Sequence, residues 1–207
     1  MIYDITPPID ELLRVWPGDT PPTREILCSM SDGDNLTLST LHATVHLGAH
    51  VDAPSHYGAD APPIDRRSLD YYVGRCQVVR VDVPRGTRVT PDMIHTTIDS
   101  PRILLATNTY PDPTSFNQNF AALSPSLVKA FHEAGVLLIG IDTPSVDLFE
   151  STDLPAHKAF LSHDMAILEG IVLDDVPEGI YELIALPLKL VGFDASPVRA
   201  ILRTPLS

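Results

Sequence analysis

Residues 35–56 read NLTLSTLHATVHLGAHVDAPSH and place three histidines and one aspartate within eleven consecutive positions. These four residues are His46, His50, Asp52 and His56. Imidazole and carboxylate groups are the ligands that zinc and similar divalent ions accept. The segment therefore predicts a metal site. The competing interpretation, in which these are ordinary core and surface histidines, explains such a dense cluster less well.

The local sequence predicts that this segment is an extended strand. Residues 35–47 are rich in Leu, Thr and Val and show no 3.6-residue apolar repeat. Side chains alternate between the two faces of a strand, so His46, His50 and Asp52 would point the same way. A helix would also align His46 with His50, but Gly48 makes a continuous helix costly. We therefore expect one strand to present the ligands together.

Two histidines near the ends of the segment are interpreted separately. Pro54 is expected to end the strand, which places His56 on a loop that turns over the site. His42 shares the parity of the ligands but lies further back along the strand. We expect His42 to support the site rather than to bind metal.

Length and charge exclude several classes of protein. The 207 residues suit one well-buried domain, and we expect a single domain over residues 1–207. A formal net charge of -13 without a basic cluster argues against nucleic acid and anionic membranes as partners. Neither a signal-peptide pattern nor an apolar run of about 18 residues is present, so a cytoplasmic location is expected. Cys28 and Cys76 lie in apolar runs and are expected to be buried free thiols.

Short apolar runs separated by prolines predict many brief strands joined by firm turns. These runs are rich in Val, Ile and Leu, which is typical of buried strands, and they cover residues 24–30, 35–47, 76–83, 102–107, 136–142, 181–190 and 198–203. Two helices are expected, at residues 125–134 and 155–165, each with a proline in its first turn. Helices are too few to alternate with the strands. The predicted fold class is therefore α/β, with a mixed sheet or barrel-like core and flanking helices.

Three residues outside the cluster are further candidates for a site. Trp16, the only tryptophan, lies in the turn-forming run VWPGDTPP. A loop aromatic that binds a ligand and a hydrophobic plug over the end of the sheet explain Trp16 equally well. His157 and Glu169 lie twelve residues apart and could complete a metal shell, but this spacing alone does not distinguish ligands from solvated or capping residues. The same holds for other polar residues at the ends of predicted elements, namely Asp142, Thr143, His163 and Asp164.

The segment HLGAHVDAPSHY resembles the H-x-G-T/A-H-x-D-x-P-x-H motif of the cyclase-like metal-dependent hydrolases. Further segments in the same order resemble the bacterial kynurenine formamidases (arylformamidases) within that family, namely WPGDTPP, GIDTPS, MAILEGIVLDDVPEG, YELIALPLKL and DASPVRAIL. The resemblance covers essentially the whole chain. It implies a swivelling β/β/α fold and a homodimer.

The resemblance also implies roles for individual residues. One zinc ion would be bound by His46, His50 and Asp52. A second would be bound by Asp52, His157 and Glu169, so Asp52 would bridge two Zn²⁺ ions per subunit, with Mn²⁺ or Co²⁺ as possible substitutes. In addition, His56 matches the catalytic acid and base, and Trp16 matches the aromatic residue that contacts the substrate.

The activity implied by the resemblance is hydrolysis of N-formyl-L-kynurenine to L-kynurenine and formate, a step of tryptophan degradation. A metal-activated water would attack the formyl carbon. His56 would take the proton of the water and deliver it to the arylamine nitrogen, because that nitrogen leaves poorly as an anion. Two alternatives stay open: another amide hydrolase of the same family, such as an isatin hydrolase, or a metal-binding protein without catalytic activity.

Overall fold

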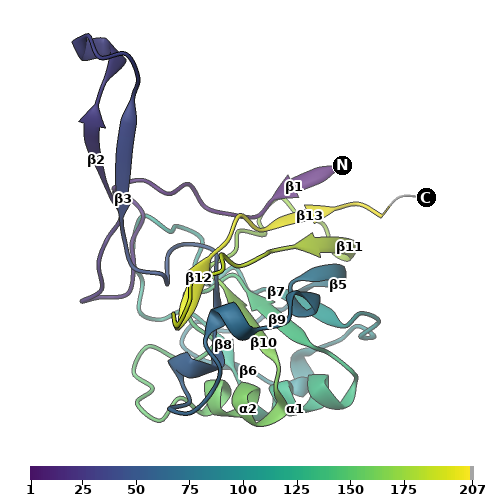
Figure 1. Ribbon diagram of the computed structural model, residues 1–207. Coiled ribbons are helices and arrows are strands. Elements are labelled where there is room, and N and C mark those ends of the chain that lie inside the picture. Colours follow the sequence, from purple (N-terminus) through teal and green to yellow (C-terminus); the bar gives the residue numbers. More distant parts are fainter. Residues whose placement is uncertain (206–207) are drawn as a thin grey trace.

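A nine-stranded mixed sheet forms the centre of the computed structural model, which describes residues 1–205 (Figure 1). From one edge to the other, the strands are β1 (Ile2–Asp4), β13 (Ile201–Arg203), β11 (Gly179–Ile184), β5 (Val73–Arg80), β7 (Arg102–Ala106), β9 (Leu138–Ile141), β10 (Ala166–Glu169), β4 (His50–Asp52) and β12 (Ala195–Pro197). The four strands β5, β7, β9 and β10 run parallel, and the strands on either side pair antiparallel. The predicted α/β class with a mixed sheet is confirmed.

Alternating side chains of the middle strands fill two cores on opposite faces of the sheet. Ile103 and Leu105 pack on the face that carries helices α1 (Pro125–Glu133) and α2 (Pro155–His163). Leu104 fills the other core together with residues of β4, β11 and β13. Strands from both ends of the sheet thus meet in this second core, so the sheet curls around it as a half barrel (Figure 1).

Both helices form where the sequence predicts them. Ser124 caps α1, because its Oγ accepts a hydrogen bond from the backbone N–H of Leu127 at 3.1 Å. Gly135 follows the helix with a φ of 86°, a left-handed conformation that glycine adopts easily. Helix α2 begins at Pro155, as predicted, and ends at His163 rather than at residue 165.

The single strand predicted over residues 35–47 is wrong. The chain forms β3 (Leu38–His42), leaves extended structure, and returns to the sheet only in β4. In the intervening loop Gly48 has a φ of 55°. A Cβ atom on Gly48 would lie 3.2 Å from Cγ of Pro7, so the N-terminal segment packs tightly against this turn. The ligand segment is therefore a loop followed by a short strand.

Strand β3 pairs only with β2 (Thr23–Cys28), and the resulting hairpin projects from the rest of the molecule (Figure 1). The expectation of a buried strand at residues 24–30 is wrong, since Ile26 and Leu27 are 57% and 52% exposed. Cys28 is likewise only partly buried, whereas Cys76 is buried as predicted. The hairpin has no second layer to cover it.

The remaining predicted strands agree with the structure in place but not always in length. The runs at 76–83, 102–107 and 136–142 overlap β5, β7 and β9. The runs at 181–190 and 198–203 are longer than β11 and β13. Strand β11 ends at Ile184, which pairs with Val73, the first residue of β5. A second small sheet of β6 (Arg88–Val89) and β8 (Ala122–Leu123) was not predicted. Across residues 1–205, no helix has the length and apolar character needed to cross a membrane.

Candidate metal centre

Strand β4 supplies two of the predicted ligands and holds them in the middle of the molecule. It lies between β10 and β12, and His50 is directly opposite Glu169 on β10. Val51 points into the hydrophobic core, so His50 and Asp52 share the opposite face of the strand. The predicted alignment of these two residues is confirmed, and the register adds Glu169 beside them.

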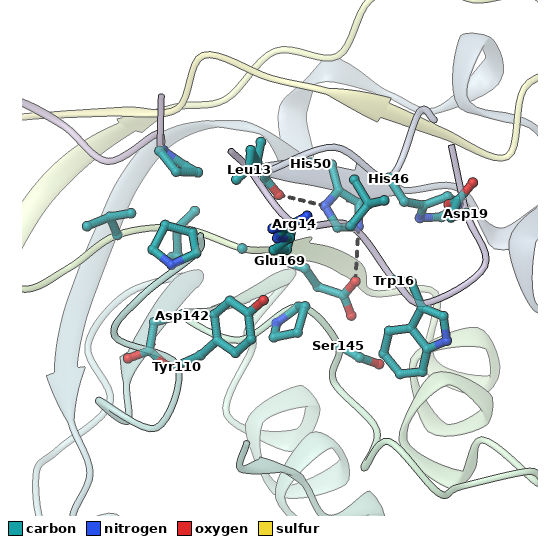
Figure 2. Close-up of a pocket in the computed structure, with 18 of the residues that line it drawn as sticks. Leu13, Arg14, Trp16, Asp19, His46, His50, Tyr110, Asp142, Ser145 and Glu169 are labelled. Carbon is teal, nitrogen blue, oxygen red and sulfur yellow. Dashed lines mark hydrogen bonds and ion pairs between the residues drawn. The ribbon is translucent and has the colours of Figure 1, made fainter. Parts of the chain in front are cut away.

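A backbone contact orients the ring of His50. Its Nδ1 lies 2.9 Å from the carbonyl oxygen of Gly48, which can only accept, so Nδ1 carries the proton. The other ring nitrogen, Nε2, lies 3.2 Å from Glu169 Oε2 (Figure 2). Asp52 Oδ1 lies 3.6 Å from the same Nε2. The hydrogen bond from Nδ1 to the Gly48 carbonyl oxygen fixes the ring so that Nε2 faces these carboxylates, the orientation in which an imidazole binds a metal.

Helix α2 brings His157 to the same place from the other side. His157 Nδ1 donates to Asp147 Oδ2 at 2.8 Å, and its Nε2 lies 3.5 Å from Asp52 Oδ2 and 3.9 Å from Glu169 Oε1. Asp147 also accepts from the backbone N–H groups of Ala156 and His157, so it caps α2 while it orients the ring. The sequence prediction missed Asp147, because the loop that brings this carboxylate back to the helix has no local signature.

The loop before β4 and the short 3-10 helix Pro54–His56 after it contribute the two remaining histidines. His46 Nδ1 lies 3.1 Å from Asp52 Oδ1, and its Nε2 lies 2.9 Å from Asp194 Oδ2. His56 Nδ1 lies 3.5 Å from the same Asp194 oxygen. His56 thus lies close to the other donors, as predicted, but on a short 3-10 helix rather than on a loop. Asp194 was missed as a site residue and reaches it because it directly precedes β12.

Electrostatics within this cluster favour a bound cation. Asp52 is 1% exposed; burial opposes its ionisation, yet the imidazoles of His157 and His46 hold its pKa well below the usual range. Burial also opposes the charging of the two imidazoles, but the carboxylates around them outweigh it and raise the pKa of His46 to about 9 and that of His157 to about 10. Without a metal, protons therefore supply the positive charge that these buried carboxylates require.

The donor set fits a bound metal ion. Both oxygens of Asp52 are buried and neither has a hydrogen-bond partner within residues 1–205. The side chains form two groups in which the donor atoms all lie within 4.8 Å of one another. One group consists of His50, Asp52 and Glu169, and the other of His46, Asp52 and His56. Asp52 belongs to both groups, which suits a bridging carboxylate. The groups differ from the predicted ligand sets in three ways: His56 takes the place of His50 beside His46, Glu169 groups with His50, and His157 belongs to neither group.

The metal-binding cluster opens into a pocket of about 540 Å³ with largely apolar walls (Figure 2). Trp16 and Tyr110 line this pocket together with several prolines. The Trp16 ring packs against Phe149 with 4.9 Å between ring centroids, and Phe116 and Phe120 lie nearby. Trp16 thus lines the pocket and also packs into an aromatic cluster, and its contact with a ligand stays a prediction.

His42 is not part of the site, so the expectation that it supports the ligands is wrong. It lies on the projecting hairpin, where its Nε2 is 2.9 Å from Glu25 Oε2 and both side chains are 55% exposed. His163 stacks on His132 at the end of α2, with ring centroids 4.5 Å apart. Asp142 lines the pocket and accepts hydrogen bonds from Thr107.

Comparison with known proteins agrees with this geometry. Residues 3–148 match the Cyclase family model, described as "Putative cyclase". The chain belongs to this family. The predicted membership is therefore confirmed.

Solved structures support the assignment to the Cyclase family. A "potential metal-dependent hydrolase with cyclase activity" shares 29% identity over 99% of both chains, with a TM-score of 0.84. A "predicted metal-dependent hydrolase" from Bacillus stearothermophilus shares 29% identity over 98% of this chain and 97% of its own, with a TM-score of 0.82. Isatin hydrolase A from Labrenzia aggregata shares the fold at 22% identity and a TM-score of 0.86, over 99% of this chain and 94% of its own. This cyclase-family chain thus has the fold of metal-dependent hydrolases along its length.

Proposed function

We propose that this cyclase-family protein hydrolyses N-formyl-L-kynurenine to L-kynurenine and formate, as an arylformamidase of tryptophan degradation. The observation that carries the proposal is the direct opening of a buried nitrogen and oxygen donor cluster into a pocket walled by Trp16 and Tyr110. The cluster suits hydrolysis of an amide, and the aromatic wall suits an aryl group on that amide.

We also propose a homodimer, which sedimentation analysis would test.

The proposed metal ligands follow from the positions of the donor atoms. His46, His50 and Asp52 would bind one zinc ion, and Asp52, His157 and Glu169 would bind the second, with Mn²⁺ or Co²⁺ as substitutes. When bound, such ions supply acidification of water and polarisation of a carbonyl oxygen. Asp147 accepts a hydrogen bond from Nδ1 of His157, and the Gly48 carbonyl oxygen accepts one from Nδ1 of His50. The Nε2 atom of each ring is therefore directed at the Asp52 carboxylate.

His56 is placed to move the protons that the reaction requires. Its side chain is 35% exposed and lines the pocket, with its ring centroid 4.3 Å from that of His46. Asp194 lies 3.5 Å from His56 Nδ1 and would hold that edge of the ring, so Nε2 would accept the proton of the attacking water. The same nitrogen would then donate to the arylamine nitrogen as the C–N bond breaks. Trp16 would stack on the aryl ring of the substrate.

A second candidate reaction is hydrolysis of isatin, a cyclic aryl amide. The shared fold of isatin hydrolase A favours it, and the same donor cluster and aromatic wall would serve ring opening. The two reactions differ in product, because only the first releases formate.

Protein purified without chelator, combined with a formate-release assay, tests the proposed function. We expect stoichiometric zinc, formate release from N-formyl-L-kynurenine, and a much lower turnover of isatin. His56→Ala should keep its metal content and lose most turnover, whereas His42→Ala on the hairpin serves as the matched control and should keep both. Faster hydrolysis of isatin would favour the second candidate. Metal without any hydrolysis would indicate a non-catalytic binding protein.

A further inference from the structure

Arg14 is the only lysine or arginine among the described residues that line the pocket. Its positive charge stands out in a chain whose formal net charge is -13. The other ionisable residues of the pocket are histidines of the metal centre, Tyr110 and the acidic residues Asp19, Asp142, Glu169 and Asp174. An anionic ligand that enters this pocket would therefore find only one permanently charged cationic side chain.

The backbone and side chain of Arg14 are held in place while most of its guanidinium stays free. Its backbone N–H donates to the carbonyl oxygen of Pro113 at 2.9 Å, and its Nε donates to that of Thr114 at 3.2 Å. The two terminal nitrogens have no hydrogen bond or carboxylate partner within residues 1–205. Figure 2 shows Arg14 among the residues that line the pocket. The loop of residues 111–114 thus presents a preoriented donor pair to the pocket.

Arg14 differs from the five arginines of the chain that pair with carboxylates. Ion pairs with carboxylates engage Arg67, Arg75, Arg88, Arg199 and Arg203. Arg14 has no carboxylate of this kind within 4.0 Å among the described residues, although it belongs to a strongly acidic protein. A guanidinium group binds a carboxylate through two parallel hydrogen bonds. A carboxylate is therefore the ligand that the free terminal nitrogens of Arg14 suit best.

We propose that Arg14 binds the carboxylate of the substrate and makes the enzyme selective for aryl amides that carry an amino-acid head group. This inference rests on the proposed arylformamidase function and extends it to the end of the substrate that does not react. The aryl ring would lie against Trp16, the formyl group would face the metal centre, and the carboxylate would reach Arg14. A neutral substrate such as isatin would make no use of this charge.

Two substrates that differ only in the carboxylate test the proposal. N-formyl-L-kynurenine carries it, and N-formylkynuramine has hydrogen in its place. For Arg14→Gln we expect kcat/KM to fall roughly 10- to 30-fold on the first substrate, the effect of losing one charge-assisted hydrogen-bonding group, and to change less than about twofold on the second. Arg14→Lys, which keeps the charge without the fork, should recover part of the loss. Arg85→Gln, a change of equal charge at an exposed position outside the pocket, should alter neither substrate.

The outcomes separate the two proposals. Equal losses on both substrates, or no loss on either, would overturn the role of Arg14 while the proposed function stands. If the wild-type protein hydrolyses neither formylated amine, the proposed function is wrong and the carboxylate role falls with it. Metal content and melting temperature of Arg14→Gln equal to those of the wild type would show that the variant is folded and loaded.

Discussion

Two histidine and glutamate pairs, one on the projecting hairpin and one buried in the nine-stranded sheet, show what burial does to the same chemistry. His42 and Glu25 lie 2.9 Å apart on neighbouring strands, with both side chains 55% exposed. His50 and Glu169 lie 3.2 Å apart on β4 and β10, with side chains 5% and 4% exposed. Water stabilises the charges of the exposed pair, so the pair contributes little to stability. The buried carboxylates need a cation beside them.

The comparison teaches that local sequence does not distinguish a structural pair from a metal site. Both histidines follow short apolar runs, and both have a strand neighbour that carries a carboxylate. Of the two strands, only β4 has a strand on each side. It carries Asp52 itself, and the first turn of α2 adds His157 to the pair. The number of buried acceptors around one histidine, rather than the pair itself, creates the site.

Asp52→Asn would break the buried half of this comparison most completely. The amide keeps the size of the side chain but removes the charge that both donor groups share, so metal binding and hydrolysis should be lost. We expect kcat to fall by about 10³-fold or more, in line with the loss of metal-based catalysis. Elemental analysis and formate release measure the two effects. Asp32→Asn on the exposed hairpin is the control, and retention of full metal content by Asp52→Asn would contradict a bridging role.

Replacing the glutamate of each pair tests the comparison directly. Glu169→Gln should lower turnover by roughly 100-fold, because it removes the charge of a proposed metal ligand and leaves His50 beside a neutral amide. Glu25→Gln should change the free energy of unfolding by less than about 0.5 kcal/mol and leave turnover unchanged. Kinetics and chemical denaturation of both variants are the measurements. Similar effects at the two positions would show that burial is not the deciding difference.

Asp147→Asn should have a smaller effect, because it acts on the metal through His157. The asparagine side chain is neutral, so it can no longer offer the imidazole of His157 a charged acceptor. We expect metal affinity to fall by roughly 10- to 100-fold. Stability should fall as well, since Asp147 also caps α2 and pairs with Arg88. Competition with a chromophoric chelator measures affinity. Unchanged affinity in a folded variant would show that the ring keeps its orientation without this carboxylate.

The dependence of metal binding on pH is the mildest expected effect. In the metal-free protein the pKa of His46 is about 9 and that of His157 about 10, so both rings hold protons at pH 7. Zinc must displace these protons, and its apparent affinity should rise with pH up to that range. Calorimetry in buffers of different ionisation enthalpy measures the protons released; none released at pH 7 would contradict the expectation.

The raised pKa values of His46 and His157 also determine how the stability of the metal-free protein changes with pH. The folded pKa values of His46 and His157 lie above the usual value of about 6.5. Their contribution to the stability of the metal-free protein is therefore complete below pH 6.5 and is lost as the pH rises through about 9 to 10. Denaturation of the chelator-treated protein across this pH range measures the loss.

The sequence alone determined the features that depend on a few neighbouring residues. Ser124 and Pro125 predicted the start of α1, and the apolar runs predicted β5, β7 and β9, because caps and strand periodicity act over one or two turns of chain. The parity of His50 and Asp52 was likewise correct, since both lie on one short strand. The resemblance of several segments in order supplied the family.

Only the tertiary structure decided which elements are buried and which distant residues meet. The left-handed turn at Gly48 divides the predicted strand, and packing against Pro7 favours it. Asp147 and Asp194 reach the site through loops, and the register of β4 with β10 places Glu169 opposite His50. Local sequence rules extend over a few residues, whereas burial and register are set by contacts between segments far apart in the chain. The metal-binding cluster depends on those contacts.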